Sequence, residues 1–169
     1  GRGVTIKHFA ANNQETNRYN NNSNVSQRAL REIYLRGFGL CIRESQPAAV
    51  MTSYNSWNGI PNSASSYLLT NILRNEWGFK GYVYSDWGAV AMLKDFQHTA
   101  KDDSEAAIQA LTAGVDLEAS SNCYWVLEQL IEQGRFDEKY VDLAVGRILR
   151  VKFELGLFEN LIVKLMING

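Results

Sequence analysis

The chain has 169 residues, of which 46% are hydrophobic and 21% charged, a composition typical of one globular domain with a buried core. Its 17 basic and 18 acidic residues leave a net charge of -1. The chain therefore lacks the excess of positive charge that is typical of proteins that bind nucleic acid or an anionic membrane. No apolar run approaches the roughly 18 residues of a spanning helix, and no signal sequence is visible. We therefore expect a soluble domain that binds a neutral small molecule. The sequence does not indicate its cellular compartment.

Four strand-and-helix units follow one another along the chain. Each begins with a short β-favouring run, continues through a polar loop and ends with apolar residues at helical spacing. The expected strands are residues 4–9, 48–54, 82–86 and 115–118. The expected helices are residues 26–41, 65–77, 90–96, 105–113, 124–133 and 138–155. Four such units in succession predict an α/β fold with a parallel sheet.

Residues that usually cap helices stand at several of these boundaries. Asn24 or Ser26 can cap the first helix, and Asp102 with Glu105 has the spacing of a capping box. Glycines follow three of the later helices: Gly114, Gly134 and Gly156.

The two cysteines are far apart in the sequence. Cys41 and Cys123 each lie in a helical apolar pattern. That pattern predicts two buried free thiols rather than a disulfide or a metal site.

Two architectures suit four βα units: an open doubly wound sheet, and half of a (β/α)8 barrel, which takes about 250 residues in full. Periodicity alone does not choose between them. Polar candidates follow all four expected strands, as a barrel active site requires, whereas an open sheet gathers its site mainly at one switch point. We therefore favour residues 1–160 as the second half of a catalytic barrel domain. Residues 161–169 are apolar without periodicity and stay unassigned.

Asp86 ends the third expected strand and is followed by Trp87 and Gly88. A carboxylate at that place points into the mouth of a site, where it suits a nucleophile that attacks the anomeric carbon of a sugar. The neighbouring indole offers an apolar face to a pyranose ring. The alternative is that Asp86 only caps the helix that follows.

Lys7 and His8 stand side by side at the end of the first expected strand, and both can donate to sugar hydroxyls. Adjacent residues of a regular strand point to opposite faces, so their joint use requires a distorted strand. Arg18 either holds a hydroxyl or pairs with Glu15 to shape the loop, and we favour the structural role.

Met51 and Tyr54 flank the end of the second strand, where a thioether and a phenol can line a sugar pocket. Asp116 and Glu118 are expected to end the fourth strand and to form local caps and pairs. The order of Asp95, His98 and Asp102 lacks the tight spacing of metal ligands, so we expect no metal, and no cofactor is indicated.

Together these motifs resemble glycoside hydrolase family 3, the β-glucosidase-like enzymes. The resemblance covers about residues 3–160 and is carried by KHFAANNQETNR, RALREIYLRGF, VMTSYNSWNG, LRNEWGFKGYVYSDWGA, AGVDLE and GRILRVKFELGLFEN. It implies a (β/α)8 barrel and retaining hydrolysis of terminal β-D-glucosyl residues, with Asp86 as the nucleophile. The subsite in which the bond breaks would be lined by five residues: Lys7, His8, Met51, Tyr54 and Trp87.

The stretch after His8 differs from the PGHG-like pattern of the N-acetylglucosaminidase branch. The resemblance therefore implies a glucosidase-like or xylosidase-like member, and Trp87 favours glucose.

The resemblance also implies parts that this chain lacks. Earlier barrel strands would supply an Asp and an Arg for sugar hydroxyls, and a downstream α/β domain usually supplies the acid/base Glu. A retaining mechanism needs two carboxyl groups about 5 to 5.5 Å apart, and only one is assigned here. We therefore expect an incomplete fragment with little activity alone, whose unpaired strand edges favour self-association. The alternative function is a non-catalytic α/β domain that binds a sugar through Lys7, His8 and Tyr54.

Overall fold

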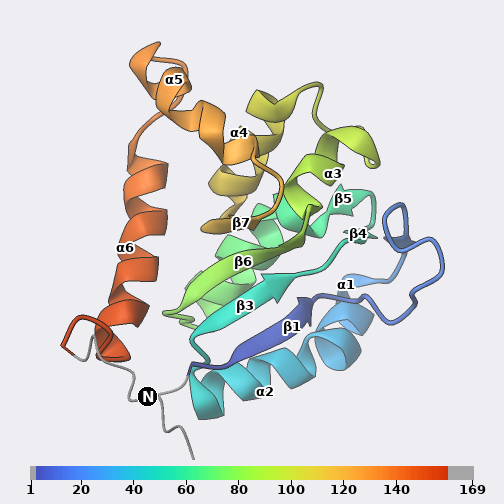
Figure 1. Cartoon of the computed structure of the whole chain (residues 1–169). Coiled ribbons are helices and arrows are strands. Elements are labelled where there is room, and N and C mark those ends of the chain that lie inside the picture. Colours follow the sequence, from blue (N-terminus) through green and yellow to red (C-terminus); the bar gives the residue numbers. More distant parts are fainter. Residues whose placement is uncertain (1–2, 160–169) are drawn as a thin grey trace, which may run out of the picture.

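The computed structural model describes residues 3–159, and a parallel sheet lies at its centre (Figure 1). Its strands, in spatial order, are β1 (Thr5–Phe9), β3 (Ala49–Thr52), β6 (Tyr82–Trp87) and β7 (Leu117–Ala119). All three pairings are parallel, so the C-terminal ends of the strands share one edge of the sheet. The expected tail, residues 161–169, lies outside the described residues.

Helical segments follow each strand, in the order that the sequence predicts. After β1 come α1 (Gln27–Ala29), the π-type segment η1 (Leu30–Tyr34) and α2 (Arg36–Ser45). After β3 come the 3₁₀ turn η2 (Asn62–Ala64) and the π-type helix η3 (Tyr67–Glu76). After β6 come α3 (Ala89–Asp95) and α4 (Asp103–Ala113). After β7 come the 3₁₀ turn η4 (Cys123–Val126), α5 (Leu127–Glu132) and α6 (Lys139–Glu154).

The helix caps have local causes. Ser26, not Asn24, caps α1, since its Oγ accepts from the backbone N–H of Ala29 at 3.1 Å. Asp102 caps α4 by accepting from the N–H of Glu105 at 2.8 Å. The Glu105 carboxylate reaches the N–H of Lys101, one residue earlier than a regular capping box requires.

A second, small sheet joins segments that the sequence predicts to be loops. It consists of β2 (Asn22–Ser23), β4 (Ser56–Trp57) and β5 (Ile60–Pro61). Asn58 and Gly59 make the turn between β4 and β5, and both have positive φ, as the tight turn of a two-residue hairpin requires. Strands of two residues show no alternation, so periodicity could not reveal them.

One face of the main sheet packs against the helices and forms the core. Val50 and Val83 are fully buried on this face, and helix residues that are also fully buried cover them: Leu30, Leu35, Ile42, Leu68, Leu69, Ile72, Leu73 and Leu93. The fully buried side chains that α4 adds to this core are small, which allows close packing of the helix against α3, η2 and η4: Ala106, Ala107 and Ala110. No helix within residues 3–159 has both the length and the apolar composition needed to cross a membrane.

Only one of the two cysteines is buried. Cys123 is buried and free, as predicted, but Cys41 is exposed, so the prediction of a buried thiol there is wrong. In that helical segment the buried stripe passes through Leu35 and Ile42. Cys41, one residue before Ile42, is turned by about 100° from that stripe, onto the solvent side.

Candidate active site

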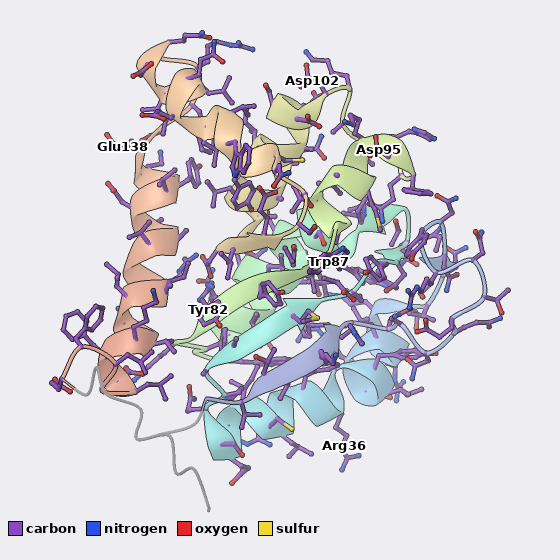
Figure 2. All side chains as sticks on the ribbon, in the orientation of Figure 1. Arg36, Tyr82, Trp87, Asp95, Asp102 and Glu138 are labelled. Carbon is purple, nitrogen blue, oxygen red and sulfur yellow. The ribbon has the colours of Figure 1, made fainter. Side chains whose placement is uncertain are left out.

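Residues from β1 and β6 meet at the C-terminal edge of the main sheet. His8 Nε2 lies 3.4 Å from Asp86 Oδ2, and the side chains are 33% and 15% exposed. Figure 2 labels Tyr82 and Trp87, the first and last residues of β6, and the meeting point lies at the Trp87 end. The fold thus brings together the two motifs in which the sequence concentrates its polar candidates.

Asp86 faces away from the helix layer. Along β6 the buried residues are Val83 and Ser85, whereas Asp86 is half-buried and belongs to the opposite face. Its Oδ1 accepts from the N–H of Trp87 at 2.7 Å. Helix α3 begins after Gly88, which has a φ of +73° and gives no side-chain cap. The alternative that Asp86 caps this helix is therefore not what the structure shows.

Strand β1 is distorted at Lys7 and His8. Ile6 pairs with Val50, but Phe9 pairs with Thr52, so β1 holds one more residue than β3 over this interval. Such a bulge re-aims side chains that a regular strand would send to opposite faces. The Lys7–His8 peptide bond is cis, as is the bond after Phe9.

Lys7 is not part of the His8–Asp86 ion pair, but it lines a pocket with His8. It makes no ion pair within residues 3–159, and with His8 it lines a pocket of about 280 Å³. The same pocket is lined by Asn12, Asn13 and Tyr34. The Asn12 Oδ1 atom is buried without a hydrogen-bond partner in the described part of the chain. Donors and an acceptor thus surround a space beside His8.

Tyr54 joins the ends of β3 and β6. Its hydroxyl donates to the Trp87 carbonyl at 2.9 Å. Burial, followed by the negative charge of Asp86, raises the pKa of Tyr54 well above its usual value, so the phenol stays protonated at neutral pH. The Trp87 side chain is 68% exposed beside them. Met51 is half-buried and pairs in register with Tyr84 on β6.

Arg18 contributes to this site through aromatic rings. It pairs with Glu15 at 2.9 Å, as the structural prediction holds, and its guanidinium lies over the rings of Tyr19 and Tyr54, at 5.1 and 5.2 Å from their centroids. Tyr19 also packs edge-on against Tyr54 and tilted against Phe96. Tyr19 and Phe96 were not predicted from the sequence, although an aromatic residue next to Arg18 in a polar loop was a usable signal for Tyr19.

A buried amide network holds the backbone that follows His8. Asn62 Nδ2 donates to the Ala10 carbonyl at 2.7 Å, to Ser53 Oγ at 2.8 Å and to Asn55 Oδ1 at 3.2 Å. Asn55 Nδ2 in turn reaches the Ala10 and Ala11 carbonyls, each at 3.3 Å. Asn55 and Asn62 are both fully buried. Neither residue was predicted from the sequence, since an Asn-rich loop does not show which amides turn inward.

Acidic residues elsewhere have structural roles. Asp116 was predicted to end the fourth strand and pair locally, and this is wrong: it precedes β7 and forms buried ion pairs with Arg74 at 2.5 Å and Arg147 at 2.7 Å. Glu118 does act locally, because it accepts from the N–H groups of Cys123 and Tyr124 at the start of η4. No group of three or more metal-type ligands occurs among residues 3–159.

The chain is similar in sequence to a known family of proteins. Residues 3–151 match the family model described as "Glycosyl hydrolase family 3 N terminal domain". Beta-glucosidase B of Emericella nidulans is 42% identical over 95% of this chain and 18% of its own length. A beta-xylosidase of Formosa agariphila is 35% identical over 92% of this chain and 23% of its own length.

A solved structure shares the fold. The beta-glucosidase from Listeria innocua in complex with glucose superposes with a TM-score of 0.87, at 40% identity, over 94% of this chain and 22% of that one. The four βα units are therefore part of a (β/α)8 barrel, and the predicted fold is confirmed against the open-sheet alternative. The chain spans about a fifth of the length of these relatives.

Proposed function

The chain belongs to glycosyl hydrolase family 3, and from this premise we propose that it supplies the nucleophile and part of the sugar site of a retaining β-glycosidase. The proposed substrate is a terminal, non-reducing β-D-glucosyl residue. One observation carries the proposal: the Asp86 carboxylate stands partly exposed at the C-terminal edge of the sheet, 3.4 Å from His8. That edge is where barrel enzymes hold their reacting groups.

In the proposed reaction, an Asp86 oxygen attacks the anomeric carbon and forms a glycosyl ester, while the leaving oxygen takes a proton from an acid. Water then attacks the same carbon, gives its proton to the conjugate base of that acid, and releases the sugar and the Asp86 carboxylate. Asp86 is the one carboxylate that we assign to this reaction. We place the acid/base Glu outside residues 3–159, in a part of a longer protein.

The neighbouring residues would bind the sugar by their ordinary chemistry. Lys7 and His8 donate hydrogen bonds to hydroxyl groups, and the exposed indole of Trp87 covers an apolar face of the ring. Met51 and Tyr54 complete the wall, with the Tyr54 hydroxyl kept protonated beside Asp86. We assign Arg18 to the same pocket through the rings of Tyr54 and Tyr19, which its guanidinium holds in place, rather than through a direct contact with sugar.

Xylose is a second candidate for the preferred sugar, because a β-xylosidase is among the relatives. Rates on a β-D-glucoside and a β-D-xyloside with the same leaving group would decide between them.

We also propose that residues 3–159 alone have little activity, since the relatives are about five times longer and only one reacting carboxylate is assigned. Within residues 3–159 the outer strands β1 and β7 each have one edge without a strand partner. These edges offer surfaces for self-association, which sedimentation of the chain would detect as a dimer.

The test of the nucleophile uses an active protein that contains this chain. Asp86→Asn keeps the shape of the side chain but removes the nucleophile, so turnover should fall by a factor on the order of a thousand or more. A 2-fluoro-glucoside should label the parent protein at Asp86, as located by peptide mass spectrometry, and should leave Asp86→Asn unlabelled. Asp95→Asn, on the neighbouring helix α3, is the matched control and should keep both activity and labelling. Labelling of the Asp86→Asn protein would remove Asp86 from the proposed role.

A further inference from the structure

Four cationic side chains surround one hollow at the end of the molecule opposite the candidate active site. The hollow measures about 330 Å³ and is lined by Arg74 of η3, Lys80 before β6, and Arg147 and Arg150 of α6. Figure 1 shows α6 passing the ends at which β3 and β6 begin, the edge of the sheet that the proposed chemistry does not use. We propose that this hollow is a binding site for a free oxyanion of the phosphate type.

The charge of the hollow is unbalanced. Four cations face two carboxylates, those of Asp116 and Asp142, which leaves a formal local charge of +2 in a chain whose total is -1. Lys80 and Arg150 form no ion pair within the described chain. A doubly charged anion would therefore balance this local charge.

Asp116 holds the two inner arginines in fixed orientations without satisfying them. Its Oδ2 accepts from Arg74 Nη2 at 2.5 Å and from the Val83 N–H at 2.7 Å, and its Oδ1 accepts from Arg147 Nη1 at 2.7 Å. Each guanidinium carries five N–H donors, so donors remain on both. Arg74 Nε is buried with no partner among residues 3–159, and the Arg74 side chain is only 9% exposed.

Electrostatics support the same picture. Burial lowers the pKa of Arg74 to about 10, the attraction of Asp116 opposes this shift, and the positive charges of Arg147 and Arg150 add to it. A bound anion would act in the opposite direction on this buried guanidinium and stabilise its charged form. Planar guanidinium groups also match the oxygens of phosphate in pairs.

The shape of α6 leaves room for a ligand. Asp142, Gly146, Arg147 and Arg150 fall on one side of the helix by their spacing, and all of them line the hollow. A Cβ at Gly146 would meet no atom within 4 Å, so the space beside it is open. Phe79 also lines the hollow, and the Arg74 guanidinium lies 5.5 Å from the centroid of its ring. An oxyanion bound here would tie α6 to the segment that leads into β6.

The test measures binding of inorganic phosphate to the chain by calorimetry, with total ionic strength held constant by chloride. The variant Lys80→Gln/Arg150→Gln removes the two exposed cations and leaves the buried ion pairs intact, so it should fold with an unchanged melting temperature in the absence of phosphate. We expect at least tenfold weaker phosphate binding for this variant. The control Arg36→Gln/Lys101→Gln removes two exposed cations that do not line the hollow, and it should bind phosphate as the parent does.

Three outcomes would overturn the proposal. Phosphate that does not bind the parent, or that binds both double variants equally, would show that the hollow is only a solvated cationic surface. Acetate that binds the parent as tightly as phosphate would refute a site for a phosphate-type anion and favour a carboxylate, such as the side chain of another protein segment. Because neither readout uses catalysis, failure here would leave the proposed glycosidase function untouched.

Discussion

Asn62→Ala tests whether the buried amide network stabilises the segment behind His8. The change removes the donors to the Ala10 carbonyl, Ser53 Oγ and Asn55 Oδ1. The Ala10 carbonyl keeps more distant donors in Ser53 Oγ at 3.2 Å and Asn55 Nδ2 at 3.3 Å, but Asn55 Oδ1 loses the donor that Asn62 provides. An orphaned buried acceptor costs about 1 to 3 kcal/mol, and a lost net hydrogen bond about 1 kcal/mol.

These terms, with a small cavity at a fully buried position, add to a loss of about 3 kcal/mol in the free energy of unfolding. Asn62 Oδ1 is itself buried without a hydrogen-bond partner among residues 3–159, so its removal offsets a part of any larger cost. In urea, with a slope of about 2 kcal/mol/M, the midpoint should fall by about 1.5 M. Amide exchange should also accelerate at Ser53, whose N–H donates to the Phe9 carbonyl at 2.9 Å.

Asn71→Ala is the matched control, because Asn71 is an exposed amide on η3, and it should change stability by no more than about 0.5 kcal/mol. A loss below about 1 kcal/mol for Asn62→Ala, or equal losses for the two variants, would refute the reasoning. The network would then be a consequence of the fold and not one of its supports.

Two further predictions concern glycine and cysteine. Gly81→Ala should destabilise the chain by about 3 kcal/mol or more, since the new Cβ would lie 2.3 Å from the Ala48 carbonyl oxygen, whereas Gly37→Ala in open space should stabilise α2 by up to about 1 kcal/mol. Thermal unfolding of both variants checks this, and equal effects would contradict it. At pH 8, iodoacetamide should modify only Cys41 in the native chain, because burial raises the pKa of the Cys123 thiol to about 12. Mass spectrometry should find the second label only after unfolding, and rapid native labelling of Cys123 would show that its burial does not protect it.

The sequence predicted the large elements because each had its own local signal. Hydrophobic spacing located the four strands and their helices, and Ser26, Asp102 and Gly114 marked real helix ends. The sequence placed Asp86 and His8 each near the end of an expected strand, and because parallel strands end at one edge of the sheet, the fold brings the two side chains together there. Each of these signals is local in the sequence, and the parallel arrangement of the strands brings the residues that carry them close together in space.

Features that depend on tertiary packing were missed. Spacing could not tell that Cys41 lies beside the buried stripe of its helix and not within it. The inward amides Asn55 and Asn62 look like any loop residues until the Ala10 carbonyl is placed near them. Asp116 was assigned to the wrong end of its strand, because a buried carboxylate with two arginine partners from distant helices leaves no local trace.

The two ends of the strands in the main sheet carry different kinds of residue. Its C-terminal edge holds the partly exposed pair His8 and Asp86, and the opposite edge holds the fully buried Asp116 between two arginines. Natural variation could therefore alter one edge with little effect on the other. A family of such chains could acquire new sugar preferences by exchanging residues around the first edge, while the ionic cluster at the second continues to hold α6 against the sheet.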